Sequence, residues 1–195
     1  MELPNYEKCQ ICIIGLGYVG LPLALEFSKT NKEDIFIATN IKRKVIGFDI
    51  NKKRINELEK GIDCTNEVNE KTIKKLKNLT FTSKVIDIIN SDVFILTLPT
   101  PIDKNKRPDL KILTEGIKTI SKAVNIQKKV NNKKTFVVII ESTVYPGVTE
   151  EICIPILEKE TGLNLNLDFI VGYSPERINP GDQKHRLDNI VKVTS

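Results

Sequence analysis

The sequence predicts an α/β protein of the Rossmann-like, doubly wound class, with a mainly parallel sheet and helices on both faces. Two observations predict it. Short apolar runs of strand length alternate with segments of helical length, which is the pattern of a parallel sheet covered on both sides. A glycine-rich turn directly follows the first apolar run. With 195 residues the chain can bury one such core, and we expect a single domain over 1–195.

Six apolar runs have the length and composition of buried strands. They are Ile11 to Ile14, Lys44 to Asp49, Leu79 to Thr82, Val93 to Leu98, Thr135 to Ile140 and Phe169 to Val171. Six strands make a full doubly wound sheet.

Helices are predicted between these strands. One of them carries apolar residues at spacings of four, three and four, a pattern that places them on the face that covers the sheet; these are Leu113, Ile117, Ile120 and Val124. Further helices are expected over 18–29, 52–60, 69–77 and 147–161, and Pro155 is expected to kink or split the last. An irregular insert at 30–44 lengthens the connection between the first helix and the second strand.

Composition excludes several classes of function. Hydrophobic residues make up 40% and charged residues 28%, as in soluble globular proteins. No apolar run approaches the roughly 20 residues of a membrane span, and the N-terminal MELPNYEKCQ is unlike a secretory signal; we expect a cytoplasmic protein. The net charge of +5 comes from scattered lysines with few aromatic residues between them, so no nucleic-acid partner is expected.

The four cysteines indicate neither a metal site nor redox chemistry. Cys9 and Cys12 form a single CxxC without a second pair of ligands, and the one histidine, His185, is far along the chain; we expect no metal. Cys12 lies inside a predicted strand rather than at a helix start, which favours core packing over a redox role. Cys64 and Cys153 stand alone.

The glycine-rich turn, GLGYVG, has the context of a dinucleotide site. Gly15, Gly17 and Gly20 follow a predicted buried strand and open a predicted helix. In that setting the first glycine allows the tight turn, the second lets the pyrophosphate approach the backbone, and the third lets the helix pack on the strand. The helix N-terminus offers free N–H groups to the pyrophosphate. Tyr18 and Val19, between the last two glycines, complete the predicted cofactor loop.

Asp49, at the end of the second predicted strand, favours NAD over NADP. Its carboxylate can accept hydrogen bonds from both adenosine ribose hydroxyls and would repel a 2′-phosphate. It lies 29 residues after Gly20, against a usual spacing of about 20, and the insert accounts for the difference. Arg54, a further candidate for contacting the cofactor, weakens this discrimination together with Lys52 and Lys53, because basic side chains tolerate a phosphate. A strand-end or helix-capping acid is the alternative interpretation of Asp49.

Three further motifs extend the prediction from a fold to a family. They are LTLPTPID at 96–103, IIESTVYPGVTEE at 139–151 and VGYSPERINPGDQKHRLDNI at 171–190. Together with GLGYVGLPLA and VIGFDIN, and in this order, they closely resemble the N-terminal NAD-binding domain of the UDP-glucose/GDP-mannose dehydrogenase family. The branch most similar is that of the UDP-N-acetyl-hexosamine 6-dehydrogenases of bacterial and archaeal surface polysaccharide synthesis.

The resemblance implies a reaction and residues that carry it. Family members oxidise the C6 alcohol of a UDP-sugar to a carboxylate in two hydride transfers to NAD. Ser142 and Thr143 are implied to contact the cofactor, and three residues are implied to line its cleft: Pro99, Thr100 and Pro101. A rigid proline-flanked turn is the alternative for these three.

Two residues match family positions that act on a catalytic water. Thr143 matches the threonine that helps to hold it, and Glu176 matches the glutamate assigned to acid/base work during thioester hydrolysis. A helix-capping hydroxyl and a solvated acid are the respective alternatives. Where the UDP-glucose branch has a second glutamate this chain has Pro180, so Arg177 and Asn179, with Glu176, become candidates for contacting a different sugar. Arg177 can also be a surface cation.

The resemblance covers only the first domain of the family enzymes. Their middle domain, with its nucleophilic cysteine, and their C-terminal nucleotide-sugar domain are expected to be missing here, as is the segment through which the family forms homo-oligomers. We therefore expect the chain by itself to be inactive. Two interpretations stay open, the cofactor-binding portion of a nucleotide-sugar dehydrogenase and a stand-alone NAD-binding or regulatory module. Thr143 and Glu176 favour the first, since a pure binder needs neither.

Overall fold

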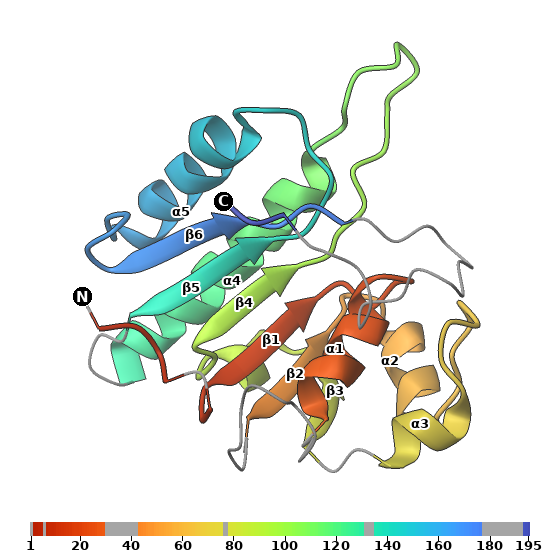
Figure 1. The fold of residues 1–195 in the computed structure, drawn as a ribbon. Helices are drawn as coiled ribbons and strands as arrows, with labels where there is room; N and C mark the ends of the chain where they lie inside the picture. Colours follow the sequence, from red (N-terminus) through yellow and green to blue (C-terminus); the bar gives the residue numbers. More distant parts are fainter. Residues whose placement is uncertain (1, 6, 30–42, 76–77, 131–134, 177–192) are drawn as a thin grey trace.

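A single six-stranded sheet forms the centre of the molecule in the computed structural model (Figure 1). The structure describes residues 2–5, 7–29, 43–75, 78–130, 135–176 and 193–195. All five strand pairings are parallel, and the strand order is β3-β2-β1-β4-β5-β6. The predicted Rossmann-like class is confirmed, and the sheet is wholly rather than mainly parallel.

Each predicted strand is present, with ends that shift by at most two residues. The strands are β1 Gln10–Ile14, β2 Lys44–Phe48, β3 Leu79–Thr82, β4 Val93–Leu96, β5 Phe136–Ile140 and β6 Phe169–Tyr173. β4 ends two residues before the predicted Leu98, whose N–H donates to the Ser142 hydroxyl at 3.0 Å. At the sheet edge, Tyr173 and Ser195 exchange backbone hydrogen bonds of 2.8 and 3.0 Å.

The helices divide between the two faces of the sheet (Figure 1). One face carries α1 Gly20–Ser28, α2 Lys52–Glu59 and α3 Glu70–Lys75, and the other carries α4 Lys111–Val130, α5 Ile154–Thr161 and the 3₁₀ turn η1 Val85–Ile88. Strand residues alternate between the two cores: Ile11 and Ile13 face α1, whereas Cys12 and Ile14 face α4. Such two-sided burial is why the strands are nearly continuous apolar runs.

The predicted helix over 147–161 is split. A π-helical turn, η2, runs over Thr149–Cys153, and α5 follows it at once. The turn closes where the Ile154 N–H donates to the Thr149 carbonyl, five residues back. Pro155 then lies in the first turn of α5, directly after the wider π-helical turn. The segment stays helical over 149–161, and the expected split takes the form of a change from π-helical to α-helical geometry next to Pro155.

The strand order places one position at the centre of the carboxyl edge. β1 pairs with β2 on one side and with β4 on the other, so the chain reverses its winding direction there. Ligands of open parallel sheets bind in the crevice outside the carboxyl ends of the strands at this switch point. Most of the predicted insert, 30–42, lies outside the described residues. Within the described part, no helix is long and apolar enough to cross a bilayer.

Candidate functional site

The three glycines of the loop between β1 and α1 differ in what surrounds them. Gly15 has a φ of +97°, and an added Cβ would approach Leu98 Cδ2 to 2.8 Å. At Gly20 the added atom would lie 1.8 Å from the Gly15 carbonyl oxygen, whereas at Gly17 it would meet nothing within 4 Å. The first and third glycines therefore allow the turn and the helix packing, and the second leaves space above the loop.

Tyr18 and Val19 lie between these glycines. Tyr18 is exposed, and Val19 is buried immediately before α1. The Val19 side chain gives no cap to the helix. Within the first turn of α1, the Leu21 N–H donates to the Gly17 carbonyl at 3.1 Å, and Pro22 has no N–H. An anion at this helix start would therefore depend on the N–H groups of the glycine turn itself and on the positive dipole end.

Asp49 follows β2 and is tied to the glycine loop. The Leu16 N–H donates to its Oδ2 at 2.9 Å, and the Asn51 N–H donates to its Oδ1 at 2.9 Å. Each carboxylate oxygen accepts one backbone hydrogen bond in these two contacts and has further lone pairs for a ligand hydroxyl. The acid expected at the strand end is thus held beside the loop that carries the glycines.

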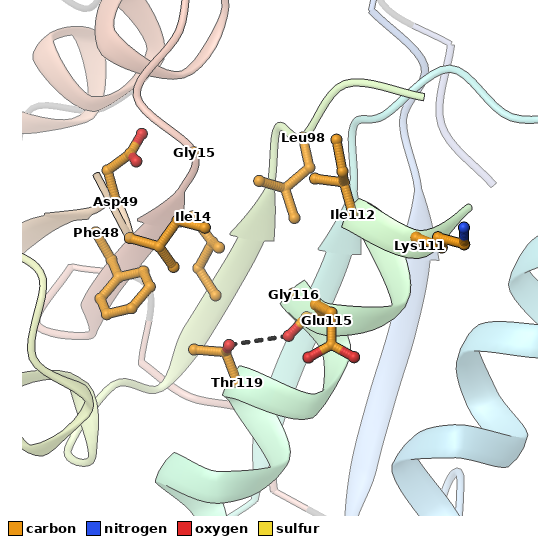
Figure 2. A pocket seen from close by; sticks show the side chains of 11 residues that line it. Ile14, Gly15, Phe48, Asp49, Leu98, Lys111, Ile112, Glu115, Gly116 and Thr119 are labelled. Carbon is orange, nitrogen blue, oxygen red and sulfur yellow. Dashed lines mark hydrogen bonds between the residues drawn. The ribbon is translucent and has the colours of Figure 1, made fainter. Parts of the chain in front are cut away.

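A cavity of about 230 Å³ opens next to Asp49, at the carboxyl ends of β1, β2 and β4 (Figure 2). The surface that lines it is mainly apolar; the residues are Ile14, Gly15, Phe48, Asp49, Ile50, Leu98, Lys111, Ile112, Glu115, Gly116 and Thr119. In Figure 2, Asp49 lies on one side of the cavity, and Leu98 and Ile112 lie on the other. A mainly apolar slot with the Asp49 carboxylate at its edge suits a flat heterocycle joined to a sugar with free hydroxyls.

Arg54 lies under the glycine loop and does not line this cavity. Its side chain is 7% exposed. Nε donates to the Leu16 carbonyl at 2.8 Å, and Nη1 donates to the Cys64 sulfur at 3.2 Å. Nη2 lies 2.7 Å from Asp63 Oδ1. Of the three cations that the sequence places near Asp49, this one is enclosed and paired with an acid.

Side-chain hydroxyls join the loops that follow β1, β4 and β5. The Thr97 hydroxyl donates to the Gly15 carbonyl at 2.7 Å. The Ser142 hydroxyl accepts from the Leu98 N–H at 3.0 Å, and the Thr100 hydroxyl donates to the Thr143 carbonyl at 2.5 Å. These bonds hold three neighbouring loops as one rim. Pro99 and Pro101 lie on the exposed part of the loop after β4.

Thr143 and Glu176 lie on the same rim as the glycines. Thr143 is exposed just after β5, and Glu176 is half-buried just after β6. The Glu176 N–H donates to the Glu141 carbonyl at 3.2 Å, which draws the segment after β6 toward the end of β5. Because β5 and β6 pair, the two residues come from adjacent loops. β6 lies three strands from β1 in the sheet, or about 14 Å at the usual strand spacing. The predicted substrate residues Arg177 and Asn179 lie outside the described residues.

The contacts of two residues in this region, Thr97 and Asp63, could not be predicted from the sequence. Thr97 stands within LTLPTPID, and only the fold brings its hydroxyl to the Gly15 carbonyl. Asp63 pairs with Arg54 across a turn. Its one local signal is Thr65 two residues later, whose N–H and hydroxyl both donate to Asp63 Oδ1, as in an Asx-turn.

The cysteines do not gather at the rim. Cys9, Cys12 and Cys153 are buried, and Cys64 is exposed. Burial, with a smaller effect of Glu150, raises the pKa of the Cys153 thiol to about 11, and burial raises the pKa of Cys12 as well. Both are protonated thiols at neutral pH. Among the described residues, no three His, Cys, Asp or Glu side chains gather as metal ligands would.

Comparison with known proteins places this site in a family. The profile described as "UDP-glucose/GDP-mannose dehydrogenase family, NAD binding domain" matches residues 9–194. The chain belongs to this family. Its fold and its glycine loop are those of the family's NAD-binding domain.

Two curated family members and one solved structure are especially similar. The UDP-N-acetyl-D-glucosamine 6-dehydrogenases of Pseudomonas aeruginosa and Salmonella typhi are 50% and 48% identical over 189 residues, which are 97% of this chain and 40% of each relative. The structure of the UDP-D-ManNAc dehydrogenase from Pyrococcus horikoshii superposes with a TM-score of 0.72 at 33% identity, over 88% of this chain and 37% of that one. The chain therefore spans about 40% of the length of the curated relatives.

Proposed function

We propose that the chain binds NAD along the carboxyl rim of its sheet. The adenine occupies the apolar cavity, Asp49 accepts hydrogen bonds from the adenosine ribose hydroxyls, and the pyrophosphate lies over Gly17 at the start of α1. The nicotinamide end then runs along the loops after β4 and β5, toward Thr100 and Thr143. The observation that carries the proposal is the contact between Asp49 and the glycine loop through the Leu16 N–H, because it joins the sugar-binding acid to the phosphate-binding turn.

NAD is preferred to NADP in this arrangement. A 2′-phosphate would meet the Asp49 carboxylate, and Arg54, which could have neutralised it, is enclosed and paired with Asp63. Lys53 is exposed, and its amine is 3.9 Å from Glu57; such surface pairs contribute little. Calorimetric titration of the chain with each dinucleotide tests this. We expect NAD to bind and NADP to bind at least about tenfold more weakly, the equivalent of one charge-assisted hydrogen bond. NADP binding as tightly as NAD would contradict it.

We further propose that the whole protein of which this is the NAD-binding portion is a UDP-N-acetyl-hexosamine 6-dehydrogenase. The 50% identity to a UDP-N-acetyl-D-glucosamine 6-dehydrogenase supports this class of substrate. Oxidation of a C6 alcohol to a carboxylate removes two hydrides and adds one oxygen from water, so the site needs groups that hold and deprotonate water as well as a hydride acceptor.

Thr143 and Glu176 are our candidates for the water chemistry. The exposed Thr143 hydroxyl can orient a water, and the half-buried Glu176 carboxylate can take a proton from it. Their places on adjacent loops of one rim support the pairing. In the whole enzyme, Glu176→Gln should lower kcat about 100-fold or more, as for a general base, while NAD binding persists. Unchanged turnover of UDP-N-acetylglucosamine by this variant would remove Glu176 from the mechanism.

A further inference from the structure

We propose that Asp63 is a positioning residue for the dinucleotide, acting through Arg54 to aim the Gly17 N–H at the pyrophosphate. This inference rests on the proposed NAD site. Asp63 lies in the segment between α2 and α3, away from the cavity, and its side chain is fully buried. It therefore touches neither adenosine nor phosphate and influences the cofactor only through its neighbours.

Two peptide groups flank Leu16, and each is held by different contacts. In a trans peptide, the carbonyl of one residue and the N–H of the next point in opposite directions. The group between Gly15 and Leu16 is held at both ends, since the Thr97 hydroxyl donates to the Gly15 carbonyl and the Leu16 N–H donates to Asp49. The group between Leu16 and Gly17 is held at its carbonyl end by Arg54 Nε. Its other end is the Gly17 N–H.

Arg54 thus fixes the direction in which the Gly17 N–H points. The Leu16 carbonyl is directed inward to the guanidinium, and the N–H of the same peptide group is directed away from it. The space beyond Gly17 is open, since a Cβ there would meet nothing within 4 Å. Without the bond from Arg54 this peptide group could rotate more freely, because glycine restricts its own backbone least of all residues.

Asp63 is what keeps Arg54 in place. A buried guanidinium is costly unless it is paired, and Asp63 is the acid beside it, 2.7 Å from Nη2. The carboxylate is itself anchored, because the Glu67 and Val68 N–H groups donate to Oδ2 at 3.0 Å each. Removing the negative charge would leave Arg54 as an unpaired buried cation, which would turn toward water and release the Leu16 carbonyl.

The test compares two ligands in Asp63→Asn, Arg54→Met and the double variant. NAD contains the pyrophosphate, and adenosine does not, although both fill the cavity and reach Asp49. We expect Asp63→Asn to weaken NAD about tenfold, the effect of one lost hydrogen bond to a charged group, and to leave adenosine unchanged. In the Arg54→Met background, Asp63→Asn should cause no further loss. Equal losses for both ligands, or additive losses for NAD, would show that Asp63 only stabilises its turn.

Asp168→Asn is the matched control. Asp168 is also a buried acid that holds a turn, since it accepts from the Asn164 N–H at 2.9 Å, but it lies at the amino end of β6.

A second readout needs no ligand. With ¹⁵N-labelled glycine, the Gly17 amide resonance should shift in Asp63→Asn and Arg54→Met and stay in place in Asp168→Asn. An unmoved Gly17 resonance overturns the positioning role even if Asp63→Asn proves too unstable for titration, because Arg54→Met reports on the same bond. Absence of NAD binding by the wild type would instead contradict the proposed function, while the resonance still decides the role of Asp63.

Discussion

Gly17 and Gly20 are three positions apart in one loop, yet they lack a side chain for opposite reasons. A methyl group at Gly17 enters open space, whereas at Gly20 it would collide with the Gly15 carbonyl at 1.8 Å. We expect Gly17→Ala to leave the thermal midpoint nearly unchanged and to weaken NAD about tenfold, because the methyl occupies the approach of the pyrophosphate. Gly20→Ala should cost about 3 kcal/mol of stability by overpacking. Thermal unfolding and NAD titration of both variants separate the two roles; a Gly17→Ala protein with wild-type affinity would contradict the pyrophosphate placement.

Asp63 makes stability depend on pH in a defined direction. Burial raises the pKa of Asp63, but hydrogen bonds from Thr65, Arg54 and Val68 outweigh it, so the pKa lies below its ordinary value of 3.8. A carboxyl whose pKa is lowered on folding stabilises the fold above the unfolded-state pKa and loses that contribution as the pH falls through the folded-state pKa. The gap in thermal midpoint between wild type and Asp63→Asn should be widest above pH 3.8 and shrink below it. A gap independent of pH would show that Asp63 is not charged in the fold.

The residues that form the candidate cofactor site and its support could be predicted from the sequence only in part. Asp49 and the glycines could be predicted because their roles follow from a strand end and a turn, both of which are local patterns. The partner of Arg54 could not, since Asp63 is reached only when the segment after α2 folds back under the loop. From the sequence alone, Arg54 is a cation free to tolerate a phosphate, whereas the structure encloses it against Asp63.

Among the elements, β1 and β4 are linked at their carboxyl ends by one side-chain hydroxyl, in addition to their backbone pairing. Thr97, next to the end of β4, donates to the Gly15 carbonyl at 2.7 Å and to the Ile14 carbonyl at 3.1 Å. Thr97→Val keeps the shape and removes the donor, so we expect a loss of about 1 kcal/mol of stability together with weaker NAD binding. Thr114→Val is the control, because the Thr114 hydroxyl only bonds within α4, to Lys111. If both variants bind NAD alike, the bridge from β4 does not shape the cofactor loop.

The ends of strands and helices were predicted less accurately than the elements themselves. The alternation of apolar runs and helical segments predicted all six strands and a mainly parallel sheet, but not the strand order. The end of β4 was misplaced by two residues because a neighbouring loop, through Ser142, takes over the Leu98 N–H. The start of α1 was predicted at Tyr18 but lies at Gly20. No side chain caps that helix, so nothing in the sequence marks its first residue.

For the molecule as a whole, none of the four cysteines lies with Thr143 and Glu176 in the loops after β5 and β6. Three of its four cysteines are buried, and Cys64 lies between α2 and α3, away from Thr143 and Glu176. We expect the 195-residue chain, mixed with NAD and UDP-N-acetylglucosamine or UDP-N-acetylgalactosamine, to produce no NADH at an enzymatic rate. A sugar that is not held against the nicotinamide also lacks the contribution of orientation, which can lower the activation barrier by roughly 7 to 11 kcal/mol. Absorbance at the NADH band measures this, and turnover on the order of one per second would show that the chain is catalytically sufficient.

Calorimetric titration of wild type and Asp49→Ala with NAD and NADP, with Asp87→Ala as control, tests the adenosine site most directly. Asp87 accepts from the Thr82 hydroxyl at the end of the neighbouring strand β3 and does not line the cavity. We predict that Asp49→Ala binds NAD about tenfold more weakly and no longer prefers NAD to NADP, while Asp87→Ala behaves as wild type. Equal NAD affinity in wild type and Asp49→Ala would contradict the placement of the adenosine ribose at the end of β2.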